Sequence, residues 1–176
     1  MRRILLLDDE QNVIHALQRS LRQIFKDMDL KIELFTAPEL AIQRFSEVAF
    51  DFAISDYHMP SMNGVDFLKI IKEIQPETIR MMLSASADFN TIIGAINEAE
   101  VFRYIAKPWN TDELKETIEL AGARRDQVLE DKHLADELRV QRGEMSPQAQ
   151  EAKRLEEADP GITKVNWGPD GSVLLD

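Results

Sequence analysis

Carboxylates follow two short apolar runs in the first third of this chain. Asp8 and Asp9 close the run of residues 4–7, and Asp56 closes the run of residues 52–55. If both runs are buried neighbouring strands, the carboxylates at their ends lie about 4.8 Å apart and can share one ion. A hard cation such as Mg²⁺ takes one or two carboxylates together with waters and a phosphate oxygen. The pattern is therefore typical of a magnesium site beside one reactive aspartate.

Two hydrogen-bond donors follow later strand-like runs. Ser84 comes after residues 81–83, and Lys107 follows residues 102–105. A hydroxyl and an ammonium group can both donate to phosphoryl oxygens. With a cation to offset the charge that builds up when Asp56 attacks phosphorus, the set is complete for phosphoryl transfer to a carboxylate. Each residue alone has a plainer role, because acids and serines often cap helices and lysines are usually solvated.

The elements that must position these residues follow a simple alternation. Apolar runs alternate with helix-period segments through about residue 125, which predicts βαβ units and a parallel sheet. Strands are expected at residues 3–7, 31–36, 52–55, 79–83 and 102–105. Helices are expected at residues 11–25, 38–47, 64–74, 89–98 and 111–126. Such a chain folds as a doubly wound sheet that binds ligands at the carboxyl ends of its strands, where all the residues named above lie.

The pattern changes beyond residue 126. Apolar residues between positions 128 and 138 recur loosely at helical spacing, so the last helix is expected to continue to about residue 140. Gly143 interrupts it, and Ser146 with Pro147 is typical of the start of a short polar helix that ends at residues 159–161. Residues 162–175 are expected to form a β-hairpin, because two apolar runs flank a Gly-Pro-Asp-Gly turn.

Bulk composition limits the function classes. The chain is 44% hydrophobic and 30% charged, as in ordinary soluble proteins. No run approaches the roughly 18 apolar residues that cross a membrane, and no export signal is visible, so a cytoplasmic protein without membrane contact is expected. The absence of cysteine excludes disulfides and thiol catalysis. The net charge of −11 and the lack of a basic stripe predict no direct DNA binding, so the target is expected to be a protein.

Five positions in this order on these elements resemble the receiver domain of two-component response regulators. The sequence from Asp56 to Gly64 matches the pattern Asp-x-x-Met-Pro-x-Met-x-Gly at every fixed position. The resemblance covers residues 1–125 and implies a flavodoxin-like, five-stranded parallel sheet of order 2-1-3-4-5. Residues 126–176 are then expected to be a helical linker and a hairpin tail. The resemblance also implies that Asp56 accepts phosphate from the phosphohistidine of a partner kinase or phosphotransfer protein.

The resemblance assigns further roles around the phosphoacceptor. It implies that Mg²⁺ is held by Asp8, Asp9, Asp56 and the backbone carbonyl of His58. It implies no activity on other substrates, only uptake of phosphate and hydrolysis of the protein's own acyl phosphate.

A switch is implied next to the site. Ser84 would move toward the phosphoryl group, which Lys107 also binds, and Tyr104 would then turn inward. Trp109 and Asn110, which follow the Lys-Pro pair, are interpreted as surface or partner contacts.

Two other functions compete with this interpretation. An aspartate-dependent phosphatase of the haloacid dehalogenase type would resemble a strand ending in Asp-x-Asp-x-Thr, whereas residues 8–12 here contain no threonine. A pseudo-receiver scaffold would not need all five site residues. The output is expected through a downstream protein or through the tail, which is interpreted as a docking or dimerisation element. Its hairpin needs a surface to cover, which is its own receiver, a second protomer or a separate protein.

Overall fold

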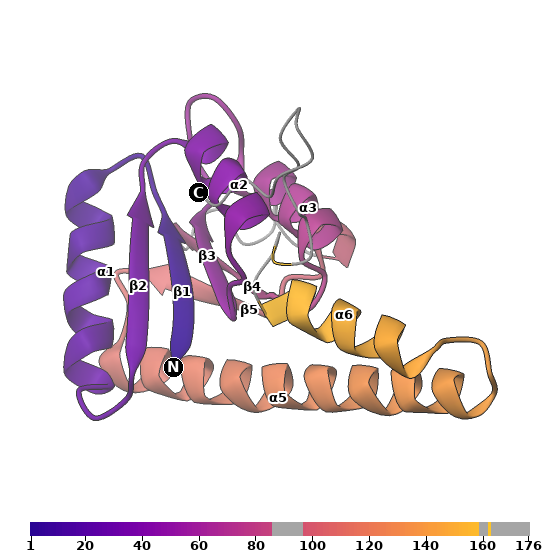
Figure 1. Ribbon diagram of the computed structural model, residues 1–176. Coiled ribbons are helices and arrows are strands. Elements are labelled where there is room, and N and C mark those ends of the chain that lie inside the picture. Colours follow the sequence, from indigo (N-terminus) through magenta and orange to yellow (C-terminus); the bar gives the residue numbers. More distant parts are fainter. Residues whose placement is uncertain (86–96, 159–161, 163–176) are drawn as a thin grey trace, which may run out of the picture.

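Five parallel strands form one sheet in the order β2-β1-β3-β4-β5 (Figure 1). The structure, a computed structural model, describes residues 1–85, 97–158 and 162. The strands are β1 Arg2–Leu7, β2 Leu30–Phe35, β3 Phe52–Asp56, β4 Ile79–Ala85 and β5 Arg103–Lys107. The flavodoxin-like order expected from the sequence is confirmed, and each strand lies within two residues of its predicted position.

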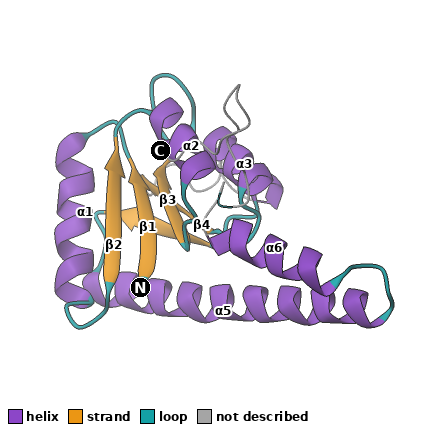
Figure 2. Ribbon diagram, in the orientation of Figure 1, coloured by secondary structure: helices purple, strands orange, loops and turns teal. Residues whose placement is uncertain are grey.

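Helices pack on both faces of this sheet (Figure 2). They are α1 Gln11–Ile24, α2 Pro38–Glu47, α3 Gly64–Ile74, α5 Thr111–Gln141 and α6 Pro147–Ala158. The helices α1 and α5 bury apolar side chains on one face, and α2 and α3 do so on the other. The expected helix at residues 89–98 lies almost entirely outside the described residues.

The alternation of side chains along β1 shows why the core has two layers. Ile4 and Leu6 belong to the cluster under α1 and α5, whereas Leu5 and Leu7 belong to the cluster under α2 and α3. A strand covered on both faces needs apolar residues at every position, so β1 reads as a continuous apolar run. This run brings Asp8 and Asp9 to the carboxyl edge of the sheet.

The helix α5 runs unbroken for 31 residues (Figure 1). Its first turns bury Leu114, Ile118 and Ala121 against the sheet. The remainder continues beyond the sheet, which confirms the predicted helical extension. At its start the side chain of Asn110 accepts hydrogen bonds from the backbone N–H groups of Asp112 and Glu113, at 2.8 and 3.1 Å. Asn110 is therefore a helix cap, and it is also exposed, which agrees with the surface position expected from the sequence.

The predicted polar helix is present as α6, which runs back along α5 (Figure 1). Ser146 Oγ accepts a hydrogen bond from the N–H of Ala149 at 3.1 Å, as expected of an N-cap. Gly143, at φ +72°, occupies the turn between the helices in a conformation that favours glycine. The predicted hairpin at residues 162–175 lies outside the described residues, except for Ile162. Within the described part of the chain, no helix is long and apolar enough to span a membrane.

Candidate functional site: an acidic cluster at the carboxyl edge of the sheet

Three carboxylates meet where β1 and β3 end. One ligand atom from each of Asp8, Asp9 and Asp56 lies within 4.8 Å of the others. The strands are direct neighbours, with Leu7 paired to Ser55, so the residues that follow them emerge side by side. Asp8 is fully buried and Asp56 is 4% exposed, whereas Asp9 is exposed. The site therefore has a buried floor and one carboxylate on the solvent side.

Lys107 reaches this cluster from the end of the edge strand β5, two strands away from β3. Its Nζ lies 2.7 Å from Asp8 Oδ2 and 2.6 Å from Asp56 Oδ1. Burial alone would lower the pKa of Lys107, but hydrogen bonds to Asp56 and Asp8 outweigh burial and raise that pKa. The side chain is therefore a charged ammonium at neutral pH. Lys107 pairs with Ala85 at the end of β4, so its backbone lies at the same edge of the sheet as the carboxylates.

The electrostatic balance of the cluster favours a further cation. Burial raises the pKa of Asp56, the hydrogen bond from Lys107 works against this, and the nearby Asp8 charge adds to the increase. Three carboxylates facing one ammonium leave an excess of negative charge. A divalent ion with oxygen ligands would neutralise that excess, so the donor set fits Mg²⁺.

The acid pair also has a local structural role. Asp8 Oδ1 accepts a hydrogen bond from the N–H of Glu10 at 2.8 Å, directly before α1. This bond goes to the N-cap residue itself, and α1 has no side-chain cap hydrogen bond, so the helix-cap role considered for acids at this position does not apply to Asp8. The second oxygen of Asp8 contacts Lys107, and Asp9 remains exposed beside it.

The loop after Asp56 depends on a close backbone approach. A Cβ atom on Gly64 would lie 2.1 Å from the carbonyl oxygen of Asp56, so no other residue fits without movement. The N–H of Gly64 donates to the carbonyl of Tyr57 at 2.9 Å, and Asn63 caps α3 by accepting from the N–H of Asp66. Met59 and Met62 pack against the core under α2 and α3. The close approach at Gly64 and the hydrogen bonds of Gly64 and Asn63 thus restrict the backbone conformation of the loop after Asp56.

Ser84 and Tyr104 are joined through the backbone. Ser84 is buried at the end of β4, and the hydroxyl of Tyr104 donates to its carbonyl at 2.9 Å, shared with the carbonyl of Ala85 at 3.0 Å. Movement of the chain at Ser84 would therefore disturb Tyr104. His58 is exposed, with its ring 4.6 Å from the ring of Tyr57 between centroids. Its role as a carbonyl ligand stays a prediction.

Trp109, interpreted from the sequence as a surface or partner contact, packs against the core in the structure. It is half-buried against the core under α1 and α5, and its Nε1–H donates to Ser20 Oγ at 3.0 Å. The chain segment that presents Lys107 is therefore fastened to α1. The Lys107–Pro108 peptide bond in this segment is cis. Sequence reasoning missed Ser20 entirely, because a serine within a polar helix surface carries no signal of its partner.

The fold and site together define a receiver-type domain of signalling proteins. The response regulator receiver domain family matches residues 4–119, and the chain belongs to that family. This membership confirms the resemblance and displaces the phosphatase of the haloacid dehalogenase type.

Similar proteins support the same placement. The chain is 36% identical over 119 residues to the hydrogenase transcriptional regulatory protein HoxA of Bradyrhizobium diazoefficiens, covering 67% of this chain and 23% of HoxA. The chain thus spans about a quarter of the length of that relative. The signal receiver domain of an HD domain-containing protein from Pseudomonas fluorescens matches with a TM-score of 0.63 and 31% identity, covering 72% and 98% of the two chains. Response regulator TrrA of Thermotoga maritima, solved with Mg(2+)-BeF, matches with a TM-score of 0.60 and 26% identity, covering 69% and 99%.

Proposed function

We propose that this chain is a phosphoacceptor switch in which Asp56 takes a phosphoryl group from the phosphohistidine of a sensor kinase or phosphotransfer protein. The observation that supports this most directly is the position of Lys107, whose ammonium group contacts Asp56 and Asp8 in one acidic cluster. Membership of the receiver family supports the same proposal.

The proposed chemistry assigns one task to each side chain. An oxygen of Asp56 attacks phosphorus, and the bond from phosphorus to the donor histidine nitrogen breaks. Lys107 and the Ser84 hydroxyl donate hydrogen bonds to the phosphoryl oxygens. Asp8, Asp9, Asp56 and the carbonyl of His58 would hold Mg²⁺, which when bound offsets the negative charge of the transfer. The presence of Mg(2+)-BeF in the TrrA structure supports this cofactor.

Output is proposed to pass through protein contacts. The hydrogen bond from Tyr104 to the Ser84 carbonyl supports a coupled switch, in which Ser84 moves toward the phosphoryl group and Tyr104 follows. We propose that these 176 residues act on a downstream protein, through the receiver surface or the tail, and have no activity on other substrates. The net charge of −11 supports a protein target over DNA for this stretch of chain. HoxA is named as a transcriptional regulatory protein, but this chain covers only 23% of it.

Phosphorylation with acetyl phosphate and Mg²⁺ tests the assignment of Asp56. The unchanged chain should acquire one phosphoryl group by mass, and hydroxylamine should remove it, as expected of an acyl phosphate. Asp56→Asn should acquire none, whereas the matched control Asp131→Asn, at an exposed position on α5, should be labelled normally. A hydroxylamine-labile label on Asp56→Asn would assign the nucleophile to another residue.

A further inference from the structure

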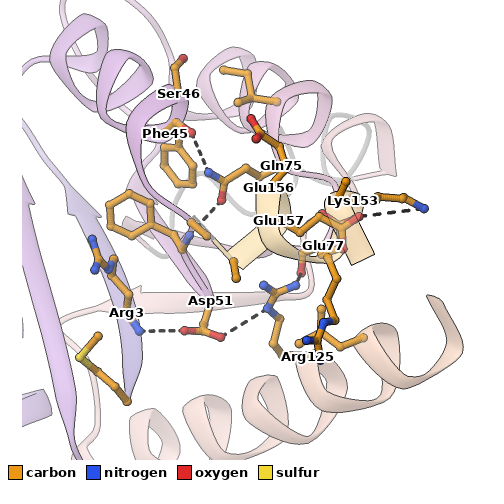
Figure 3. Close-up of a pocket in the computed structure, with 18 residues that line it drawn as sticks. Arg3, Phe45, Ser46, Asp51, Gln75, Glu77, Arg125, Lys153, Glu156 and Glu157 are labelled. Atoms are coloured by element: carbon orange, nitrogen blue, oxygen red, sulfur yellow. Dashed lines mark hydrogen bonds and ion pairs between the residues drawn. The ribbon is translucent and has the colours of Figure 1, made fainter. Parts of the chain in front are cut away.

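A cavity of about 950 Å³ lies beside α6 (Figure 3). Its lining residues Asp51 and Glu77 precede β3 and β4, so it lies at the end of the sheet opposite to Asp56, the last residue of β3. The walls of the cavity come from the loops that precede β3 and β4, from the middle of α5 and from the last turns of α6. Apolar lining residues include Phe45, Phe50, Ile74 and Leu129. The cavity thus separates α6 from the receiver core instead of being filled by α6.

The helix α6 is held at the rim of this cavity by charges. Lys153 Nζ lies 2.6 Å from Asp136 Oδ2, and Lys132 contacts both Glu157, at 2.8 Å, and Glu77. None of the residues of α6 is buried. Ile74 and Leu129 keep exposed fractions of 37% and 38% although they line the cavity. Phe45 and Phe50 are fully buried, so Ile74 and Leu129 are among the larger apolar side chains that stay open on this wall. Exposed apolar side chains on one wall are suited to an apolar occupant.

Most polar groups of the wall contact one another (Figure 3), although Arg125 Nε makes only an ion pair and no hydrogen bond. Gln75 donates to the carbonyl of Phe45 at 2.6 Å and accepts from the N–H of Phe50 at 2.9 Å. Asp51 accepts from the N–H of Arg3 at 2.8 Å and pairs with Arg125 Nε at 3.5 Å, while Arg125 Nη1 donates to the carbonyl of Glu77 at 2.9 Å. A charged small molecule would have to break these contacts, whereas apolar side chains would leave them intact.

We propose that this cavity is the docking site of the chain's own residues 162–175. Ala158, the last residue of α6, is itself part of the cavity wall, so the segment begins at the cavity. The three linking residues 159–161 span up to about 10 Å when extended. The segment contains the apolar residues Val165, Trp167, Val173 and Leu175, which require a surface because a two-stranded hairpin alone is marginal in water. Covalent linkage gives the chain's own segment a high effective concentration over any competitor. The proposal is independent of phosphorylation.

Cross-linking tests this directly because the chain contains no cysteine. Single cysteines at Ile74 or Leu129 are each paired with Val165→Cys or Val173→Cys and treated with a short bismaleimide. A cross-link within one chain is expected, seen as a cross-linked monomer by mass and by peptide mapping. The matched control pairs Leu138→Cys, exposed on α5 outside the cavity, with the same tail positions and should not react within the chain. Absence of a cross-link in all four cavity pairs, equal reaction of the control, or links only between chains would overturn the proposal.

Tryptophan fluorescence gives a second measurement without cross-linking. In a Trp109→Phe background, Trp167 is the only tryptophan. Its emission should be blue-shifted and protected from acrylamide. Leu129→Arg should return the emission toward that of exposed tryptophan, while the control Leu138→Arg should not. Emission of Trp167 that is already that of a fully exposed residue in the full chain would overturn the proposal.

Discussion

The ammonium group of Lys107 lies 2.6 Å from Oδ1 of Asp56, although β4 separates the strands that carry the two residues. The lysine side chain therefore extends past the end of β4 to reach the cluster. It compensates part of the charge of Asp56. Competition between this ammonium group and a divalent ion has measurable consequences.

Magnesium affinity should fall after one of two substitutions and not after the other. Asp9→Ala removes a carboxylate and should weaken Mg²⁺ binding by about tenfold or more. Lys107→Ala removes a competing positive charge and should leave the affinity unchanged or increase it, while the phosphorylation rate falls. Isothermal titration measures both affinities, and Glu39→Ala on the exposed face of α2 is the control. Unaltered Mg²⁺ binding by Asp9→Ala would mean that Asp9 is not a ligand of the metal.

Two glycine substitutions should have opposite effects on stability. Gly64→Ala places Cβ against the Asp56 carbonyl, at 2.1 Å before relaxation, and should lower the free energy of unfolding by about 2–3 kcal/mol. Gly122→Ala is the matched control. Gly122 lies within α5, and a Cβ atom there would have only Phe52 Cζ near it, at 4.0 Å. Alanine favours a helix interior over glycine by about 0.5–1 kcal/mol, so the control should be stabilised. Urea unfolding compares both, and equal stabilities of the two variants would refute the close approach.

The contact between α5 and α6 should depend on pH. The hydrogen bond from Lys153 lowers the pKa of Asp136, against the effect of burial. A lowered pKa in the folded state means that the pair contributes its full stability above the ordinary aspartate value of 3.8 and that this contribution is lost as the pH falls from 3.8 through the lower pKa of the folded state. Asp136→Asn should therefore cost about 1 kcal/mol at pH 7, and the cost should shrink steadily as the pH is lowered from 3.8. A difference that stays constant across this range in denaturant titrations would exclude the ionised pair as its cause.

Substitutions at Trp109 should separate packing from hydrogen bonding. Trp109→Phe keeps most of the ring contact but loses the bond to Ser20, and should cost about 1 kcal/mol. Trp109→Ala loses both and should cost about 2–3 kcal/mol, less than for a fully buried tryptophan. Ser20→Ala should reproduce the effect of the phenylalanine variant, and thermal unfolding measures all three. Should Ser20→Ala destabilise as much as Trp109→Ala, the division between ring and N–H is incorrect.

The fold was predictable because its signals are local. The inner strands β1, β3 and β4 are largely buried runs, whereas β2 and β5 are only partly buried edge strands. The strands β1 and β3 place Asp8, Asp9 and Asp56 at one edge through strand order alone. Ser84 and Lys107 follow from the same rule. Their roles in phosphoryl transfer stay predictions until measured.

The remaining features depend on contacts that a sequence does not display. Trp109 and Ser20 are 89 residues apart, and only the three-dimensional path of the chain brings them together. Asn110 and Thr111 are both acceptable caps, so sequence preference does not decide which one begins α5. The return of α6 rests on ion pairs such as Lys153 with Asp136, whose residues look solvated when read singly. The cavity beside α6 forms because α6 folds back toward the receiver, and no sequence pattern predicts it.

The length of α5 has a mechanical consequence. Thirty-one helical residues span about 46 Å, and the helix has no interruption between Thr111 and Gln141. Its base adjoins the segment that presents Lys107, while its far end turns into α6. A rigid rod magnifies rotation along its length, so a tilt of about 5° at the base displaces the far end by about 4 Å. A tilt at the base of α5 would therefore displace the α5–α6 turn more than any other part of the helix, against the ion pairs that hold Arg125 and Lys132 to the receiver.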